Sequence, residues 1–473
     1  MADGVGAGVG AGDELELEVG SVAHGGHCVS RHEGRVVFVR HALPGERVRA
    51  RLTEAGPGDR FWRADAVEVL QPSPDRVQAP CPLAGPGLCG GCDWQHATPA
   101  AQRRLKAAVV TEQLTRLGGI DLVATGLDRL EVRPVPGDDG GLGWRTRVRF
   151  TVDGAGRAGL LRHREHDVVP VPHCPIAHPA IDELRIGEVS WPGSAYVDAV
   201  AGGAGPVPDG EQPGSGVQRL VVVEPEGAVA GRGERRRGIA PGRAVPRVEV
   251  PPLGAETSLA RRGPDGLQRL RGRTWVEESV RVDGVRRAFR VTGGGFWQVH
   301  PGAAQTLLDT VLELTDPQPG ESALDLYCGV GLFTAGLALR VGASGQVLGI
   351  EGDARAAGDA RRSLHDLAGV RLEAGGVEPV LHRLSAAGEL TGADVVVLDP
   401  PRSGAGRRVM EAVTALRPRV VVYVACDPAS LARDISTAAG LCYRLDDVVA
   451  FDTFPMTHHV ESVARLVPVT SAT

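Results

Sequence analysis

Two valine-rich runs in the C-terminal third of the chain, each ending in a turn, most constrain its fold. The first covers residues 395–398 and stops at Asp399-Pro-Pro, and the second covers residues 420–424 and leads to Cys426. Short apolar runs of this kind suit parallel strands that are buried on both faces, and proline cannot continue a strand's hydrogen bonds. In open α/β sheets, ligands bind at the carboxyl ends of the strands. We therefore expect an α/β sheet in which Asp399 and Cys426 face one site.

A glycine turn farther upstream predicts a nucleotide-like cofactor on the same sheet. Residues 322–334 read Ser-Ala-Leu-Asp-Leu-Tyr-Cys-Gly-Val-Gly-Leu-Phe-Thr, which predicts a strand, a glycine turn and the start of a helix. A second strand at 346–350 ends in Glu351, at a spacing that places a carboxylate on ribose hydroxyls. Asp325 precedes the turn, and Thr334 stands where a dinucleotide-binding fold has its third glycine. Both details favour S-adenosylmethionine over a dinucleotide.

The length of the chain predicts more than one domain. At 473 residues, a prior of about 150 residues per domain gives roughly three domains. Short alternating runs at 13–72, separated by Gly and Pro, predict a small antiparallel β-barrel, which is either an oligonucleotide-binding or a purely structural unit. We expect a central domain at 73–285, with a Gly/Pro/Arg-rich insert of mostly surface loops at 201–262. The cofactor-binding domain should cover 286–473, and the Gly/Ala-rich residues 1–12 should form a disordered tail.

Four cysteines form the pattern of a metal site. Three of them lie close together and the fourth lies far downstream, a ligand count that fits zinc or an iron–sulfur cluster. Disulfides are a weaker explanation in an intracellular protein, and unrelated buried thiols are a further alternative. His96 and His173 are additional candidate ligands. The four cysteines are Cys81, Cys89, Cys92 and Cys174.

The charge balance does not by itself indicate a nucleic-acid partner. The formal net charge is −6, whereas a phosphate backbone is usually met by a basic surface. Lys106 is the only lysine among 52 basic residues; we attribute this bias to genome composition, although arginine also grips phosphate and stacks on bases. Two groups of arginines are candidate RNA contacts or, equally, solvated strand faces. They are Arg145, Arg147 and Arg149 in a strand at 144–150, and Arg31, Arg35, Arg40, Arg47, Arg49 and Arg51 in the barrel.

A set of motifs in one order resembles the RNA uracil-5-methyltransferases. The barrel resembles their TRAM domain, and the four cysteines resemble the iron–sulfur ligands of the ribosomal-RNA branch, although the spacing from Cys81 to Cys89 is longer than usual. The resemblance implies an OB-like TRAM barrel, an α+β central domain and a Rossmann-like methyltransferase domain. The motifs are Gln298, the turn 325–331, Glu351, Asp-Pro-Pro-Arg at 399–402, Ala-Cys-Asp-Pro at 425–428 and Phe-Pro-Met-Thr-His-His-Val-Glu at 454–461.

The resemblance implies transfer of a methyl group from S-adenosylmethionine to carbon 5 of a uridine in RNA, with 23S ribosomal RNA preferred over transfer RNA. Cys426 would attack the base, and Glu461 would remove the carbon-5 proton. A helix expected at 430–438 should lower the pKa of the Cys426 thiol through its N-terminus. The four cysteines would hold a 4Fe-4S cluster. Residues implied at the cofactor are Gln298, Asp325, Tyr327, Gly329, Gly331, Glu351 and Asp399.

Two other classes of protein compete with this interpretation. Amino-methyltransferases use a similar Pro-Pro loop, but they prefer an aromatic residue after the prolines and need no thiol, whereas this chain has Arg402 and Cys426. A non-catalytic RNA-binding protein with a structural metal is the second alternative. The sequence shows no run of about 18 apolar residues and no charged leader before an apolar stretch. We therefore expect a soluble, cytoplasmic monomer.

Overall fold

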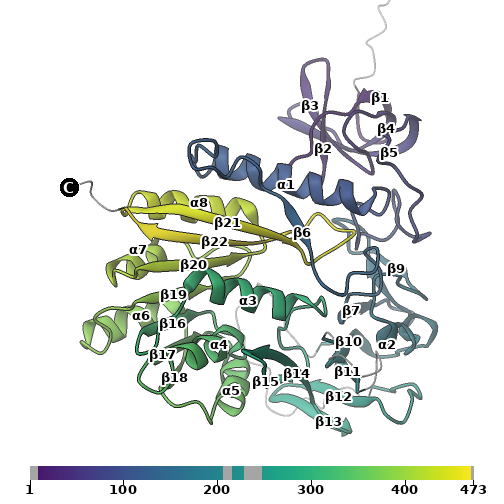
Figure 1. The fold of residues 1–473 in the computed structure, drawn as a ribbon. Helices are drawn as coiled ribbons and strands as arrows, with labels where there is room; N and C mark the ends of the chain where they lie inside the picture. The colour runs from purple at the N-terminus through teal and green to yellow at the C-terminus, as the bar shows by residue number, and fades with distance from the viewer. Residues whose placement is uncertain (1–8, 206–215, 228–247, 470–473) are drawn as a thin grey trace, which may run out of the picture.

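The computed structural model describes residues 9–205, 216–227 and 248–469 (Figure 1). Most of the tail expected at 1–12, and two parts of the insert expected at 201–262, lie outside these residues. The described chain forms four sheets, of five, seven, two and eight strands. Within these ranges no helix is long and apolar enough to cross a membrane.

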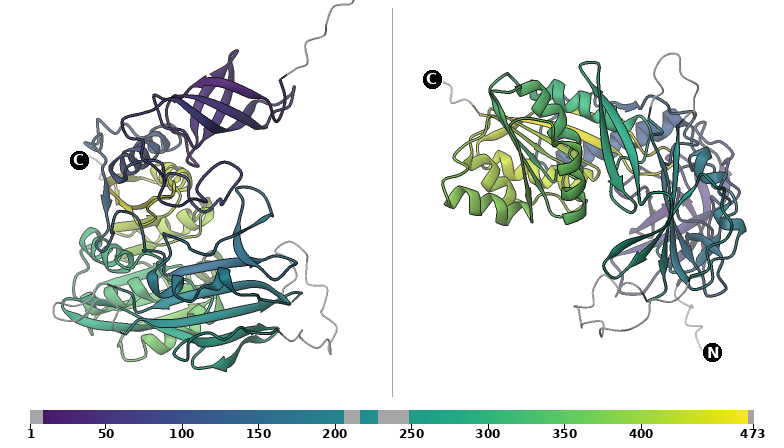
Figure 2. Two further views of the ribbon diagram at one scale, coloured as in Figure 1. Left: turned by 90° about the vertical axis from the view of Figure 1, so that its right-hand side faces the viewer. Right: turned by 90° about the horizontal axis from the view of Figure 1, so that it is seen from below.

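The N-terminal sheet is a small curled structure that agrees with the predicted barrel (Figure 2). Its strand order is β1-β4-β5-β3-β2, and alternate residues such as Val37, Val39 and Val48 point into a common apolar core. One pair, β3 with β5, is parallel, so the sheet is not purely antiparallel as expected. The strands are β1 Glu14–Glu18, β2 Cys28–His32, β3 Arg35–Arg40, β4 Arg47–Glu54 and β5 Phe61–Gln71.

The central sheet has the order β13-β12-β11-β10-β7-β8-β9 and carries the short helices α2 and η1 (Figure 1). Strand β11 and nearly all of β12 fall within the insert expected at 201–262. These described parts of the insert are therefore sheet rather than surface loop. The elements are β7 Arg147–Val152, β8 Ala158–Leu161, β9 Val168–Pro170, α2 Pro179–Asp182, η1 Ile186–Glu188, β10 Ser194–Gly202, β11 Gln218–Pro225, β12 Ser258–Gly263 and β13 Gly266–Arg271.

The C-terminal sheet confirms the predicted α/β fold. Its strand order is β18-β17-β16-β19-β20-β22-β21-β6, and the two valine runs form the neighbouring parallel strands β19 and β20. Val395 and Val397 lie in the core shared with helices α3 and α4, whereas Val396 and Leu398 lie in the core shared with α6, α7 and α8. Both faces of these strands are covered, which is why their sequences are apolar without alternation.

From β16 to β20, strands and helices alternate as the sequence predicts. The last two strands, β21 and β22, form an antiparallel hairpin. A two-stranded sheet, β14 with β15, packs against α3 and α5. The elements are β14 Trp275–Val282, β15 Val285–Thr292, α3 Ala303–Thr315, β16 Ser322–Leu326, α4 Leu332–Val341, β17 Gln346–Glu351, α5 Ala354–Ser363, β18 Val370–Ala374, α6 Val377–Ala386, β19 Val395–Leu398, α7 Arg407–Ala415, β20 Val420–Ala425, α8 Pro428–Ala439, β21 Tyr443–Asp452 and β22 Glu461–Pro468.

Helix α1 (Pro99–Arg116) and strand β6 (Val132–Pro134) join the α/β sheet, although the sequence placed both in the central domain. Strand β6 pairs in parallel with β21 at the sheet edge, and α1 packs on α8. Ala101 and Val109 of α1 also contribute to the core of the barrel. Figure 1 shows α1 running between the barrel and the α/β sheet, so this helix links the two units.

Candidate active site

The strand register places Cys426 and Glu461 across from each other. Strand β20 ends one residue before Cys426, and β22 begins at Glu461. The two strands are antiparallel, and Ala425 pairs with Ser462, so the next step along the ladder sets Cys426 opposite Glu461. Residues opposite each other in antiparallel strands have Cβ atoms about 5 Å apart. A thiol and a carboxyl group from distant parts of the chain therefore meet at one strand end.

Cys426 opens into a pocket of about 630 Å³ to which three parts of the chain contribute. One side is the barrel loop at 24–26, another is α1 at Val109, and the third is the C-terminal loop at 458–460. The barrel loop is fixed here by His24, whose Nε2 lies 2.9 Å from the Asp427 carboxylate. The pocket thus requires the barrel, α1 and the α/β sheet together.

The Cys426 thiol is protonated in the free protein, contrary to the expected lowering of its pKa. Burial raises its pKa to about 12, the carboxyl groups of Glu461 and Asp399 add to this rise, and Arg402 opposes it. The N-terminus of α8 is occupied by its own cap, because the Asp427 Oδ1 accepts the Ser430 N–H at 2.8 Å. The N-terminus of α8 therefore does not control the pKa of the Cys426 thiol.

The carboxyl groups around the thiol are also shifted toward their neutral forms. Burial and the nearby Asp399 carboxyl group raise the pKa of Glu461 well above its usual value. The Arg402 guanidinium partly opposes this rise. Burial beside Asp325 and Glu351 raises the pKa of Asp399 to about 7. Arg402 is thus the cationic group that opposes the rise in pKa of both the Cys426 thiol and the Glu461 carboxyl group.

Arg402 is held at the pocket by two contacts. Its Nη2 lies 3.2 Å from His459 Nε2, and its backbone oxygen accepts the Ser430 hydroxyl at 2.9 Å. Burial and the nearby cations lower the pKa of His459 to about 3, so the imidazole is neutral and can accept a hydrogen bond from the guanidinium. These contacts hold Arg402 at the pocket, where the residue is also exposed to solvent.

The second part of the site lies at the ends of β16 and β17, where the predicted strand, turn and helix are found. Glu351 Oε2 accepts the Gly329 N–H at 2.8 Å, so the carboxylate and the glycine turn are joined. Thr334 donates its hydroxyl to Asp325 Oδ2 at 2.6 Å, and burial raises the pKa of Asp325 to about 7. Its other oxygen, Oδ1, is buried and has no partner among the described residues. An orphaned buried oxygen fits a ligand that brings a donor.

The glycine turn adopts conformations that L side chains rarely take. Tyr327, Gly329 and Gly331 have φ values of 66°, 57° and 95°. A Cβ at Gly331 would stand 2.5 Å from Leu364 Cδ1, whereas a Cβ at Gly329 would meet open space. The backbone at Gly329 is therefore open to a ligand. Gln298, also expected at the cofactor, is buried just before α3, with no hydrogen bond to the turn among the described residues.

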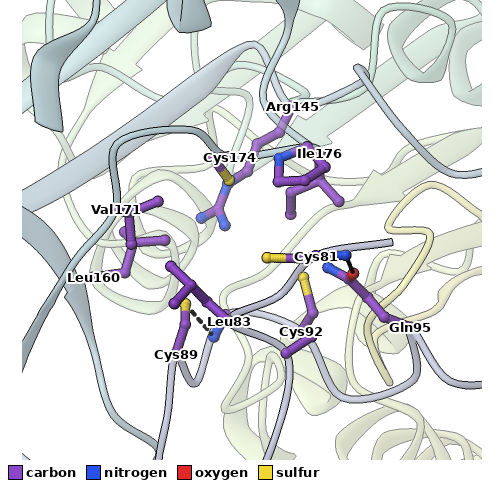
Figure 3. Close-up of a pocket in the computed structure, with 13 residues that line it drawn as sticks. Cys81, Leu83, Cys89, Cys92, Gln95, Arg145, Leu160, Val171, Cys174 and Ile176 are labelled. Carbon is purple, nitrogen blue, oxygen red and sulfur yellow. Dashed lines mark hydrogen bonds between the residues drawn. The ribbon is translucent and has the colours of Figure 1, made fainter. Parts of the chain in front are cut away.

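The four predicted cysteines line a single pocket of about 370 Å³ (Figure 3). All four thiols are free, and the rest of the lining is largely apolar, with Arg145 at one side. Among the described residues no three His, Cys, Asp or Glu side chains are arranged to hold one metal ion. His96 and His173 do not line this pocket; His173 instead contacts Asp182 at 2.6 Å.

Several arginines predicted as RNA contacts form ion pairs with carboxylates of this chain. Arg147 donates to Glu278 at 2.9 Å, and Arg149 donates to Asp198 at 2.6 Å. In the barrel, Arg51 pairs with Glu14 on the adjacent strand. Arg51, Arg147 and Arg149 are therefore paired with carboxylates, whereas Arg31, Arg47 and Arg145 form no ion pair within the described residues.

The sequence did not point to a group of buried polar residues that hold the loop before Glu461. Asp93, Gln102 and Lys106 all bond to the segment 452–458. Gln102 and Lys106 lie on the buried face of α1, where an amphipathic helix would carry apolar residues. The one sequence signal was that Lys106 is the only lysine, which composition alone appeared to explain.

Two parts of the chain match models of known protein families. Residues 383–467 match the model of tRNA (uracil-5-)-methyltransferases, and residues 10–67 match the TRAM domain. The second match coincides with the curled N-terminal sheet. The first contains β19, β20, Cys426 and the hairpin that carries Glu461.

Relatives extend the likeness over nearly the whole chain. A Streptomyces avermitilis protein named as an RNA methyltransferase is 50% identical, over 97% of this chain and 99% of its own length. The 23S rRNA (uracil(1939)-C(5))-methyltransferase RlmD of Alkalilimnicola ehrlichii is 33% identical, over 96% of each chain. The solved tRNA (uracil-54, C5)-methyltransferase of Pyrococcus abyssi, in complex with S-adenosyl-L-homocysteine, has the same fold, with a TM-score of 0.64, 23% identity, and coverage of 95% of this chain and 99% of that one.

Proposed function

Because the chain belongs to the RNA uracil-5-methyltransferase family, we propose that it methylates carbon 5 of a uridine in 23S ribosomal RNA, with S-adenosylmethionine as methyl donor. The observation that carries this proposal is the register that sets Cys426 opposite Glu461. The 33% identity to a 23S rRNA enzyme over the full chain favours ribosomal over transfer RNA. Transfer RNA is the second candidate substrate, because a transfer-RNA enzyme shares the fold.

Carbon 5 of uracil is a weak nucleophile, so the reaction needs prior activation of the ring. The Cys426 thiol releases its proton to solvent and the thiolate sulfur adds to carbon 6, while the electrons of the double bond between carbons 5 and 6 move toward the carbon-4 oxygen as an enolate. Carbon 5 then attacks the methyl group of S-adenosylmethionine, and the methyl–sulfur bond breaks to leave S-adenosylhomocysteine. A covalent Cys426–uracil adduct with a methyl group on carbon 5 remains.

Glu461 resolves this adduct. Its carboxylate removes the proton from carbon 5, the electrons of that bond restore the double bond, and the bond from carbon 6 to sulfur breaks. Burial makes Glu461 a stronger base once it is ionised, because its pKa is raised. Arg402 lowers the pKa of both reacting groups, and we infer that it stabilises whichever of them carries the negative charge.

The cofactor is assigned to the crevice at the ends of β16 and β17. The acidic groups there suit its cationic and hydroxyl-bearing parts: Glu351 would bind the ribose hydroxyls, and the unpartnered Asp325 Oδ1 would accept from the amino group. Asp399 directly follows β19, which lies between β16 and β20 in the sheet, so it stands between this crevice and Cys426. It would orient the base or the methyl donor.

We also assign an iron–sulfur cluster to the four-cysteine pocket. The four thiols line one cavity. Four cysteine thiolates are the ligand set of a 4Fe-4S cluster. Bound there, it would cross-link the segment 81–92 to Cys174.

The proposed function is tested by methyl transfer to defined RNAs. Purified protein, S-adenosylmethionine with an isotopically labelled methyl group, and either 23S rRNA or unmodified tRNA are incubated, and the digested nucleosides are identified by mass spectrometry. We expect labelled 5-methyluridine from the ribosomal RNA only. Label on another atom or base would reject the proposed chemistry, whereas label in transfer RNA alone would correct the substrate.

A further inference from the structure

Lys106 carries a charged side chain with no exposure to solvent. It lies on α1, and its Nζ donates to the Asp452 carboxylate at 2.5 Å and to the Phe454 carbonyl at 3.0 Å. The side chains of Lys106 and Asp452 are 0% and 1% exposed. Burial of two charges costs solvation free energy that their attraction often only matches, so such a pair is poor evidence of stability. A role in positioning other groups explains the Lys106–Asp452 pair better.

The two partners of Lys106 lie beside the register position of Glu461. Asp452 is the last residue of β21, directly after Phe451, and Phe451 is paired with Glu461 on β22. Phe454 is the second residue of the loop 453–460, which leads straight into Glu461. The Lys106 ammonium therefore fixes the loop end of the hairpin whose second strand begins with the proposed base.

The residue type at position 106 suits this contact. Every other one of the 52 basic residues is arginine, so a general preference for arginine does not explain this position. A compact ammonium with three donors can bond a carboxylate and a carbonyl on one side of a closed space, whereas a planar guanidinium needs a wider fork. Composition accounts for the arginines, and the buried contact accounts for the one lysine.

Neighbouring side chains hold the same loop at regular intervals. Gln102, one helical turn before Lys106, accepts the Met456 N–H at 2.8 Å. Asp93 accepts the backbone N–H of His458 at 3.1 Å. The loop is thus held from its start to its end by one side of α1 and by the segment just before it.

We infer that Lys106 is a positioning residue for the methylation reaction, holding the β21–β22 hairpin so that Glu461 reaches carbon 5 of the covalent adduct. The inference rests on the proposed function, since it assumes that Glu461 resolves the adduct. It predicts a specific defect in resolution, because Cys426 directly follows β20 and Lys106 makes no hydrogen bond to it.

The test compares Lys106→Met with Arg116→Met, which removes a charge from the exposed end of the same helix. Folding is checked by circular dichroism, and each variant is given RNA with S-adenosylmethionine. For Lys106→Met we expect a methylated protein–RNA adduct that persists on denaturing gels, with turnover lowered about 100-fold. The rate of adduct formation with 5-fluorouridine RNA should match that of the wild type, and Arg116→Met should behave as the wild type throughout.

A double variant, Lys106→Met with Asp452→Leu, keeps the test decisive if the single variant unfolds, because it leaves no unpaired buried charge. It should fold and still accumulate the adduct, because Phe454 lacks its donor. Wild-type turnover in a folded variant, or equal losses of adduct formation and turnover, would overturn the inference. Failure of the wild type itself to form a 5-fluorouridine adduct would instead remove the proposed function, and the inference with it.

Discussion

The pKa values of both reacting groups of this site are raised before substrate arrives. Burial raises the pKa of the Cys426 thiol to about 12 and that of the Glu461 carboxyl group well above its usual value, and Arg402 opposes both shifts. A buried thiol is poorly reactive toward unrelated electrophiles. Attack on uracil therefore requires the Cys426 thiol to lose its proton when the base occupies the pocket, with Arg402 stabilising the negative charge.

Replacing Glu461 with Gln should separate the two halves of the reaction. The amide cannot accept the carbon-5 proton, so turnover should fall by roughly 10²–10⁴-fold while Cys426 still adds to the base. The measurement is the amount of methylated adduct on a denaturing gel beside the steady-state rate. Glu411→Gln, at an exposed carboxylate of α7, is the control. Loss of adduct in Glu461→Gln would show that Glu461 acts before carbon–sulfur bond formation.

The raised pKa of Cys426 predicts a steep pH dependence of its alkylation. Since the pKa is about 12, the thiolate fraction, and with it the rate of iodoacetamide labelling without RNA, should rise about tenfold per unit between about pH 7 and pH 9. Peptide mass spectrometry follows the labelling of Cys426. Arg402→Met should slow it further, because Arg402 lowers this pKa. A plateau of the rate below pH 9 would contradict the assignment.

Strands and helices of the α/β sheet follow from local sequence, but the neighbours of each strand do not. The valine runs predict β19 and β20 because buried strands need apolar residues on both faces. Nothing local specifies that β22 inserts antiparallel beside β20, which is what brings Glu461 to Cys426. The polar residues on the buried face of helix α1, such as Lys106, could not be interpreted from the sequence, because their partners lie hundreds of positions away.

The glycine turn between β16 and α4 should not tolerate a side chain at Gly331. Gly331→Ala places a Cβ 2.5 Å from Leu364 and strains a left-handed backbone, at a cost of about 1–2 kcal/mol before the clash. We expect S-adenosylhomocysteine affinity, measured by calorimetry, to fall at least about tenfold, because about 1.4 kcal/mol lost from binding is a factor of ten. Gly358→Ala, within helix α5, is the matched control and should bind normally. Unchanged affinity in Gly331→Ala would place the cofactor elsewhere.

The whole molecule assembles one site from three parts of the chain. The barrel reaches it through His24, the cysteine-bearing segment through Asp93, and the α/β sheet supplies the reacting pair. The sequence motifs identified each part, yet their contact could not be predicted, because ion pairs between residues far apart leave no local pattern. For the same reason, the sequence could not show that arginines expected to face RNA pair with carboxylates of this chain, as Arg149 does with Asp198.

The four-cysteine pocket predicts a coloured protein. Anaerobic preparations should be brown, with broad visible absorbance and bound iron and sulfide. Cys89→Ser should lose the colour, whereas Cys442→Ser, at an exposed free cysteine, should keep it. A colourless protein with stoichiometric zinc would contradict the cluster.

The central claim is that Cys426 forms a covalent bond to uracil, and 5-fluorouridine RNA tests it most directly. After methyl transfer, carbon 5 carries fluorine and a methyl group but no proton, so Glu461 cannot resolve the adduct. With S-adenosylmethionine, a protein–RNA species should persist on a denaturing gel, and mass spectrometry should map the link to Cys426. The species should be missing in Cys426→Ala. No stable adduct with ribosomal or transfer RNA, or a link to another residue, would contradict the account.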